Sequence, residues 1–412
     1  MNSILIVSYH FEPENVPSVM RAQWFYRHLP SFGYKPEILA ATRTLWLRSS
    51  VRNEPEIGVH RTPEASILRG WLHLTNLANN LFSINTQVID YGLSWLPFGI
   101  WKARQIVRAL PIRAVVTTQP SIVSTLVGMH LKKAFQLPWI ADFQDPLVGN
   151  PNIIPHPIGD RWQRWIEKQI FQYADRLIAN TDSGAAMWRQ RYPEHAHKIT
   201  VIWNGYDDAE PIPPARPLTR SYRVLSHIGT IYAARHPSAL LESYERLVAS
   251  GKLDPAVLKL RFVGVFDWAA IPNPEQVHRM VRAGHLELEN QYIPRPDALR
   301  EAAEADYLLV LDMNESNSDL QVPCKIYDYL RTGRPILAFT PENSPLERII
   351  QRSGIAHEIL YNRLCSADDV DAALLRLVAI PATSRQPDPW FADTHEARSL
   401  SRMLAGELDR LV

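Results

Sequence analysis

The chain has 412 residues, of which 46% are hydrophobic and 21% charged, and its formal net charge is +1 at neutral pH. This length exceeds one ordinary hydrophobic core and predicts two domains. The composition is typical of a soluble globular protein. The balanced charge argues against a dedicated nucleic-acid binder, which needs clustered excess cations to neutralise phosphates. Two cysteines are too few for a disulfide framework, so we expect a reducing compartment.

The sequence opens with ILIVSY at residues 4–9, a run that is typical of a buried strand. It has neither the basic start nor the long apolar core of a secretory signal peptide. No stretch of the sequence reaches 18 apolar residues, the length that a membrane-spanning helix needs. We therefore expect a cytoplasmic protein, with peripheral contact at the inner face of the cell membrane as an option.

That option rests first on an uneven distribution of charge. Residues 15–53 contain six basic side chains and one acid, Glu37. The six are Arg21, Arg27, Lys35, Arg43, Arg48 and Arg52. A basic face of this kind suits anionic lipid or an anionic acceptor. A solvated surface with uneven charge is the alternative, and the sequence leaves both open.

In the first half of the chain, short β-branched runs alternate with helical patterns. The runs that predict strands cover residues 4–9, 36–42, 114–119, 137–143, 176–180 and 198–207. Helices are expected up to Leu29, with a stop near Gly33, and up to Ala134, and Thr181 is placed to cap a further helix. One more helix is predicted by apolar residues at helical spacing, which are Ile158, Trp162, Trp165, Ile166, Ile170 and Tyr173.

The alternation stops at residues 209–221, a proline-rich stretch that is typical of a semi-rigid linker, and then resumes. Further strands are predicted at residues 222–232, 258–264, 286–293, 306–312 and 334–340. A helix is expected from Ser238 to Ser250, capped by Gly251, and the last 20 residues place five apolar side chains on one helical stripe. The pattern predicts an α/β protein with two doubly wound parallel sheets, whose ligands bind at the carboxyl ends of the strands.

One polar stretch at such a strand end is HIGTIYAARH, residues 227–236. Gly229 allows the backbone to approach a ligand, Thr230 follows it, and the guanidinium of Arg235 suits a phosphate. The stretch is not a P-loop, and most glycine turns before helices are only turns, so its signal is weak by itself.

A second candidate is PCKIYDYLRTGRPIL, residues 323–337, where Lys325 and Asp328 stand near the start of a helix. A carboxylate there suits the paired hydroxyls of a ribose, and a lysine suits a phosphate. The alternative is that Asp328 only complements the dipole of its helix.

Two acids lie at the end of the predicted strand 137–143, in the sequence ADFQDP. Asp142 and Asp145 are suited to proton transfer or to orienting an acceptor hydroxyl, or else to capping their loop. His10 follows the first strand, although a lone histidine is more often structural. The 14 histidines show no spacing that is typical of a zinc site, so we assign no metal.

Five stretches in this order resemble the retaining GT-B glycosyltransferases of family 4, especially bacterial members that build surface polysaccharides. They are SYHFEPENVPSVMRAQWFYRHLPSFGY, PWIADFQDP, VIWNGYD, HIGTIYAAR and VPCKIYDYLRTGRPILAF. The resemblance implies the GT-B fold, with two Rossmann-like domains facing a central cleft. Residues 1–208 would bind the acceptor, 209–221 would link, and 222–389 would bind the donor. A C-terminal helix within about residues 390–412 would cross back to the first domain.

The resemblance also implies roles for individual residues. Arg235 and Lys325 would stabilise the diphosphate of the donor, and Asp328 would take the place of the family's ribose-binding glutamate. The other implied donor-binding residues are Gly229, Thr230, Tyr292, Ile293, Pro294, Gln321 and Val322. In the first domain, Asp142 and Asp145 stand where relatives carry a catalytic or acceptor-orienting group. The implied acceptor or loop residues are His10, Glu12, Asn15, Ser18 and Arg21.

The implied reaction transfers a sugar with retention from a nucleotide-diphosphate sugar, UDP or GDP, and uses no metal or other cofactor. The acceptor would be a glycan or a lipid-linked molecule, and no nucleic acid is expected as a partner. The sequence departs from the family where Leu320 and Asp328 replace two glutamates, and where ENVPS replaces a double glycine. A non-catalytic nucleotide-sugar-binding subunit and a sugar-nucleotide epimerase on the same fold are the alternatives.

Tryptophans supply the second reason to consider a membrane. Ten of the 12 lie at or before Trp203, and Trp71, Trp95 and Trp101 fall within residues 69–101. This stretch is suited to line an acceptor groove or to touch a membrane surface, and core packing is the alternative.

Overall fold

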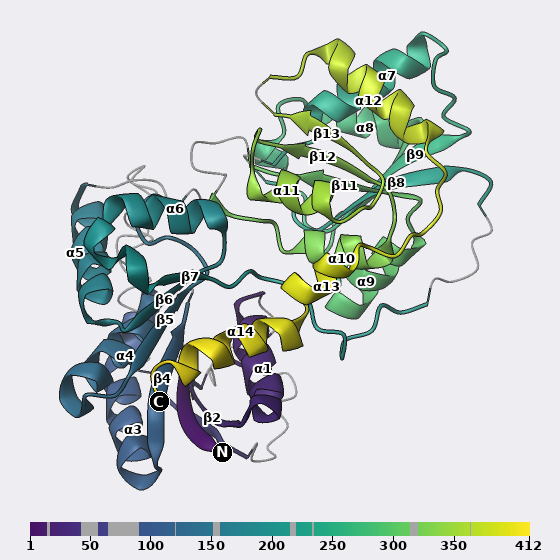
Figure 1. Ribbon diagram of the computed structural model, residues 1–412. Coiled ribbons are helices and arrows are strands. Elements are labelled where there is room, and N and C mark those ends of the chain that lie inside the picture. The colour runs from purple at the N-terminus through teal and green to yellow at the C-terminus, as the bar shows by residue number, and fades with distance from the viewer. Residues whose placement is uncertain are drawn as a thin grey trace. The chain divides into compact units, whose positions relative to one another are not determined.

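The computed structural model describes residues 1–14, 17–42, 57–64, 90–119, 121–150, 157–214, 220–232, 235–313, 320–362 and 364–412. The chain divides into two compact units, residues 1–207 with 395–412, and residues 208–394. Each unit is a parallel sheet with helices on both of its faces (Figure 1). The first boundary is close to the predicted position 208, whereas the return to the first unit comes at residue 395, later than the predicted 390.

The first unit contains a seven-stranded sheet in the order β3-β2-β1-β4-β5-β6-β7, and every neighbouring pair is parallel. Side chains alternate between its faces, so Leu5 and Val7 enter one core while Ile4 and Ile6 enter another. The strands are β1 (Asn2–Ser8), β2 (Tyr34–Ala41), β3 (Val59–Thr62), β4 (Ile112–Thr118), β5 (Trp139–Phe143), β6 (Arg176–Ala179) and β7 (Ile199–Val201).

Helices cover both faces of this sheet. The core that holds Ile4 and Ile6 is closed by α1 and by the C-terminal α14, while α3 to α6 supply side chains to the opposite core. The α-helices are α1 (Pro17–His28), α3 (Leu96–Ala109), α4 (Ile122–Phe135), α5 (Pro157–Tyr173), α6 (Asp182–Arg191) and α14 (Ala397–Asp409). The short 3₁₀ helices are η1 (Leu29–Phe32), η2 (Tyr91–Trp95) and η3 (Pro193–Lys198).

Helix ends in this unit follow the local sequence. Gly33 ends η1 with φ of 87°, a left-handed conformation that glycine adopts without steric cost. The hydroxyl of Thr181 accepts a hydrogen bond from the Gly184 amide at 3.0 Å, which confirms Thr181 as the cap of α6. The predicted apolar face of α5 is only partly right. Ile166 and Ile170 are buried, but Trp162 and Trp165 are 40% and 53% exposed.

The second unit contains a six-stranded parallel sheet in the order β10-β9-β8-β11-β12-β13. The strands are β8 (Arg223–Ile228), β9 (Leu258–Val263), β10 (Leu286–Glu289), β11 (Tyr307–Leu311), β12 (Ile336–Thr340) and β13 (His357–Tyr361). The helices are α7 (Ser238–Ala249), η4 (Trp268–Ala270), α8 (Pro274–Arg282), α9 (Arg295–Glu304), α10 (Lys325–Thr332), α11 (Pro345–Arg352), α12 (Ala367–Ala379) and α13 (Pro389–His395).

The chain leaves the first unit and returns to it at adjacent points. Tyr206 and Glu396 form an isolated parallel bridge, in which the Tyr206 amide donates to the His395 carbonyl and the Ala397 amide donates to the Tyr206 carbonyl. A Cβ on Gly205 would lie 1.7 Å from the His395 carbonyl oxygen. Only glycine therefore permits this close approach.

No helix in the described ranges is both long and apolar enough to span a membrane. The sequence suggested that tryptophans in residues 69–101 line an acceptor groove or touch a membrane surface. Trp95 gives this no support because it is fully buried, while Trp101 is 58% exposed. Trp71 lies outside the described residues.

Candidate functional site

Polar groups gather at the carboxyl edge of the second sheet. His227 lies at the end of β8 and Gly229 just after it, while Asp312 follows β11 and Thr340 ends β12. Because all six strands are parallel, their carboxyl ends share one edge. Lys325, the first residue of α10, points its ammonium group toward this edge, where a Cβ on Gly229 would lie 2.9 Å from Lys325 Nζ.

Lys325 is held by a histidine whose proton position follows from its partners. His227 is buried, with Nδ1 lying 3.1 Å from the Leu309 carbonyl oxygen and Nε2 lying 3.0 Å from Lys325 Nζ. A carbonyl only accepts, so Nδ1 carries the proton and Nε2 accepts from the ammonium group. Burial, together with the charge of Lys325, lowers the pKa of His227 well below its usual value, so the ring is neutral.

Two cations lie near each other at this edge. Burial and the neighbouring Arg235 lower the pKa of Lys325 to about 7. Arg235 is half-buried, its guanidinium carbon is 5.4 Å from the Tyr232 ring centroid, and its buried Nε has no hydrogen-bond partner among the described residues. Positive charge is thus concentrated here without full compensation.

Asp312 is an acid that interacts electrostatically with Arg235. It accepts hydrogen bonds from the Met313 amide at 2.8 Å and from the Thr340 hydroxyl at 3.1 Å. Burial raises the pKa of Asp312 to about 6, although Arg235 acts in the opposite direction. Thr340 and Met313 are neutral donors and leave the charge of this carboxylate in place. Lys325 and Arg235 in their charged forms still outnumber Asp312, so the edge remains suited to an anion.

Glycines let two strand ends approach each other closely at this edge. Gly229 has φ of 122°, and a Cβ on Gly264 would lie 2.6 Å from the Gly229 carbonyl oxygen. The Gly229 amide donates to the Val263 carbonyl at 2.7 Å. This amide is therefore part of the β8–β9 ladder. Thr230 is exposed beside it.

Asp328, which we predicted to contact a ribose, forms an ion pair with Arg295. Its two carboxylate oxygens accept from Arg295 at 2.9 and 3.0 Å, and the same guanidinium contacts Glu210 at 2.8 Å. The pair ties α10 to α9 and to the segment that enters this unit. Burial raises the pKa of Asp328, and the charge of Arg295 lowers it. Lys325 and Asp328 thus contact different partners, His227 and Arg295.

The remaining donor-side predictions lie in two loops. Tyr292 is 67% exposed, Ile293 is half-buried, and Pro294 is exposed at the start of α9. Gln321 and Val322 are buried just before α10.

In the first unit, two predicted site residues form a buried ion pair. Arg21 and Asp142 are each 1% exposed, and Arg21 donates to both carboxylate oxygens at 2.7 and 2.8 Å. Arg21 also donates to the carbonyls of Ile202 and Trp203. The pair joins α1 to β5 and to the end of β7. Asp142 is thus paired with Arg21, and burial removes Arg21 from the predicted basic face.

Other members of that basic stretch are also paired or outside the described residues. Arg27 pairs with Asp207, and Lys35 lies 3.2 Å from Glu37. Arg43, Arg48 and Arg52 lie outside the described residues. The part of the stretch that the structure describes therefore does not form the expected unpaired basic face.

The remaining predictions in the first unit differ in what the structure shows. Asp145 is half-buried after β5, and His10 Nδ1 lies 2.6 Å from Glu14 Oε2. The Glu12 carbonyl accepts from Arg61. Asn15 lies outside the described residues, and Ser18 lies within α1, where its side chain is not described.

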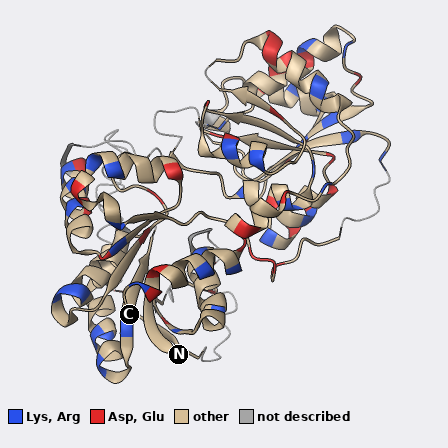
Figure 2. Cartoon of the chain, in the orientation of Figure 1, with Lys and Arg blue, Asp and Glu red and all other residues tan. Residues whose placement is uncertain are grey.

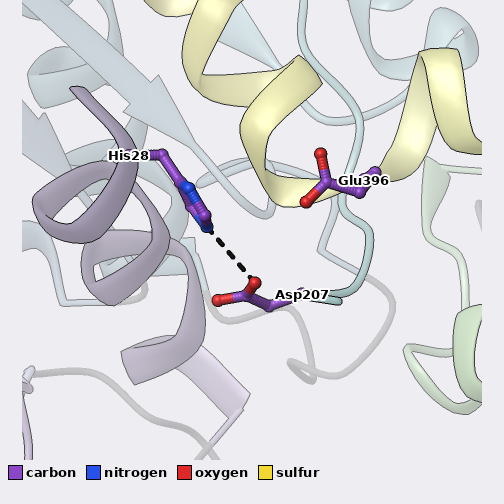
Figure 3. A group of neighbouring side chains, drawn as sticks. All are labelled: His28, Asp207 and Glu396. Carbon is purple, nitrogen blue, oxygen red and sulfur yellow. Dashed lines mark hydrogen bonds and ion pairs between the residues drawn. The ribbon is translucent and has the colours of Figure 1, made fainter. Parts of the chain in front are cut away.

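One group has the geometry of a metal site. Figure 3 shows His28, Asp207 and Glu396, whose ligand atoms all lie within 4.8 Å of one another. Asp207 pairs with Arg27 and with His28, whose Nε2 is 3.2 Å away, and Glu396 accepts from the Arg398 and Ser399 amides as the cap of α14. These contacts give the cluster a structural role where the chain returns to the first unit.

His227, Asp312 and Thr340 were missed as site residues. The sequence contained a signal for the first two, since His227 stands within the quoted HIGTIYAARH stretch and Asp312 is the last residue of a predicted strand. A polar residue at the carboxyl end of a parallel strand is a candidate by position alone. Thr340 could be recognised as a site residue only from the structure, because its hydroxyl donates to Asp312.

The architecture of two parallel-sheet α/β units, with the C-terminal helix completing the first, is the GT-B fold of glycosyltransferases. Residues 25–210 match the family model described as Glycosyltransferase Family 4. No curated protein sequence matches the chain.

Solved structures give the same fold. A protein from E. coli described as "Trehalose-6-phosphate", bound with UDP-2-fluoro glucose, is 10% identical, with a TM-score of 0.65 and 100% coverage of both chains. The lipopolysaccharide outer core galactosyltransferase WaaB is 11% identical, with a TM-score of 0.61 and 100% coverage of both. A trehalose-6-phosphate synthase studied for glycosyltransfer with retention is 11% identical, with a TM-score of 0.63 and 99% coverage of both.

Proposed function

We propose that the protein is a retaining glycosyltransferase that uses a nucleotide-diphosphate sugar as donor. The observation that carries this proposal is the pair of cations, Lys325 and Arg235, at the carboxyl edge of the second sheet. A diphosphate would supply the negative charge that this edge lacks and a partner for the buried Arg235 Nε. The family model that matches residues 25–210 supports the same class of reaction.

The proposed chemistry breaks the bond between the anomeric carbon and the diphosphate. The acceptor oxygen forms its bond to that carbon on the same face, and the leaving phosphate oxygen takes the acceptor proton. Lys325 and Arg235 would stabilise the charge that develops on the diphosphate. The proposal requires no metal or other cofactor, because these two side chains supply positive charge at the leaving group. Retention also agrees with the similar trehalose-6-phosphate synthase.

The donor base and the acceptor belong to the same proposal. UDP and GDP are the nucleotides we expect, and the similar E. coli structure holds a UDP sugar. The acceptor would be a glycan or a lipid-linked molecule in surface polysaccharide synthesis at the cytoplasmic face of the membrane. The similarity to a lipopolysaccharide galactosyltransferase supports this choice.

A second candidate is a subunit that binds a nucleotide sugar without turnover. It is favoured by the two acids that the fold employs elsewhere, Asp142 in its pair with Arg21 and Asp328 in its pair with Arg295. Both candidates predict nucleotide binding, and only the first predicts sugar transfer.

Calorimetric titration with UDP, GDP and ADP, followed by their sugars, tests the donor site. We expect one base series to bind, and we expect Arg235→Ala and Lys325→Met to weaken it at least about tenfold, since a charge-assisted hydrogen bond contributes about 1.5–3 kcal/mol. Lys252→Met is the control, because Lys252 is exposed in the same unit. If no nucleotide binds, both candidates are wrong. Nucleotide binding without acceptor-dependent release of the diphosphate would favour the second.

A further inference from the structure

Helix α5 of the first unit exposes aromatic and basic side chains together. Trp162 and Trp165 are 40% and 53% exposed, and their rings stack with centroids 5.7 Å apart and planes inclined by 17°. The core face of the same helix is already filled by Ile166, Ile170 and Phe171, each fully buried. The two indoles therefore form an apolar patch that is exposed to water and does not pack in the core.

Cations accompany the indoles on the same outward surface. Arg161, Trp165, Lys168 and Gln172 follow one another at spacings of four, three and four residues, which places them on a single stripe of the helix. All four are exposed, and Trp162 and Arg164 are exposed beside this stripe. Figure 2 shows basic residues along α5.

The acids of α5 do not cancel this charge. Glu167 is fully buried and accepts from Arg191 at 2.6 Å, and Asp160 is half-buried near the first turn. The exposed surface formed by Arg161, Trp162, Arg164, Trp165 and Lys168, which we call the α5 face, therefore carries three positive charges and no exposed carboxylate of this helix.

We propose that the α5 face docks on an anionic lipid bilayer. An indole has an apolar body and one N–H donor, and it favours the head-group region of a bilayer. Arginine and lysine near an anionic leaflet each add attraction that salt weakens. A hydrophobic protein partner would leave the three cations uncompensated, whereas anionic head groups match both kinds of side chain.

This surface differs from the one that the sequence suggested. The expected residues were Trp71, Trp95 and Trp101 with the basic stretch 15–53, of which Trp95 and Arg21 are buried. The proposal does not depend on the nucleotide site, because lipid binding is measured without donor or acceptor.

Co-sedimentation of the full chain with vesicles tests the inference. We expect binding to vesicles of mixed phosphatidylglycerol and phosphatidylcholine at low ionic strength, and little binding to phosphatidylcholine alone. The double variant Trp162→Ala with Trp165→Ala should bind about tenfold more weakly or worse. The double variant Arg161→Gln with Lys168→Gln should lose a similar factor at low salt, and at high salt it should bind as the unchanged protein does. Thermal unfolding should be unchanged, since these side chains are exposed.

The matched control is Trp101→Ala, which removes an indole that is 58% exposed on α3. It should bind vesicles as the unchanged protein does. Quenching by bromine-labelled lipids should occur in the unchanged protein and fall in the double tryptophan variant. Absence of binding to anionic vesicles would overturn the proposal, as would equal losses in the Trp101 variant and the double variant.

Discussion

At the scale of single residues, the charge of Lys325 is the property that the site controls. The ammonium group has a neutral histidine as its hydrogen-bond acceptor and a guanidinium as its electrostatic neighbour. Neither compensates a positive charge, so the proton on Lys325 is held weakly until an anion arrives. The diphosphate of a bound donor would stabilise the charged form of Lys325. The site would therefore take up a proton when it binds the nucleotide.

We predict that nucleotide affinity falls as the pH rises through about 7, where Lys325 loses its proton. The loss should approach about tenfold per pH unit above that value, because only the charged form attracts the diphosphate. Calorimetry at pH 8 in buffers of different ionisation enthalpy should show proton uptake. The Lys325→Met variant should bind weakly, without this pH dependence, and an identical pH profile in that variant would contradict the role of Lys325.

The same shift also affects folding. The folded pKa of Lys325 is about 7, below the ordinary lysine value of 10.5, so between these values the unfolded chain binds a proton that the fold does not hold. Stability therefore receives a contribution that rises with pH across this window. Denaturant titrations at pH 7 and pH 9 should show this rise in the unchanged protein, and it should be smaller in Lys325→Met. A steeper rise in the variant would contradict the lowered pKa.

The ion pair of Arg21 and Asp142 allows a test of whether Asp142 has a structural or a catalytic role. We predict that Asp142→Asn lowers the free energy of unfolding by about 3–5 kcal/mol, because it leaves a buried guanidinium without its partner. Asp182→Asn is the control, since Asp182 is exposed at the start of α6, and its effect should stay within about 0.5 kcal/mol. Unchanged stability with lost turnover would return Asp142 to the catalytic group.

At the scale of elements, the sequence predicted best where one strand or helix determines its own pattern. Short hydrophobic runs located most strands of the two sheets. Thr181 caps the start of α6 and Gly33 ends η1, as predicted. The α5 tryptophans show the limit of this reasoning. Their spacing satisfies an apolar face, but the core accommodates only Ile166, Ile170 and the neighbouring Phe171.

Local sequence patterns could not predict which side chains from distant elements contact one another. Arg21 and Asp142 are 121 positions apart, and Lys325 and His227 are 98 apart. The sequence placed Lys325 and Arg235 in one site through family resemblance, whereas Asp328 was assigned without knowledge of Arg295. A carboxylate near a helix start looks the same in sequence whether it binds a sugar or an arginine.

The turn after β8 gives a prediction at this scale. Gly229→Ala should reduce both stability and nucleotide affinity, because its φ of 122° is strained for alanine and the new Cβ would lie 2.9 Å from Lys325 Nζ. Gly251→Ala is the control, with φ of 71° and no atom within 4 Å of the new Cβ. It should lose about 1–2 kcal/mol of stability and keep its affinity. Equal affinities in the two variants would argue against the close approach at Gly229.

At the scale of the whole molecule, the first unit is built from both ends of the chain. Leu400, Leu404 and Leu408 of α14 are fully buried in the core that α1 and β1 share. We predict that Leu404→Ala lowers stability by about 2–5 kcal/mol, whereas Arg402→Ala, at an exposed position of the same helix, has little effect. Tryptophan fluorescence reports chiefly on this unit, because ten of the 12 tryptophans lie at or before Trp203. An unchanged fluorescence transition in Leu404→Ala would contradict this role of α14.

This arrangement also affects how the protein is made. The ribosome synthesises residues 1–207 and then the whole second unit before it reaches α14, the helix that closes one face of the first sheet. Until α14 has been made, Ile4, Ile6 and Phe25 lack part of their cover. The nascent first unit therefore presents an apolar surface during this interval, and such a surface favours aggregation and chaperone binding.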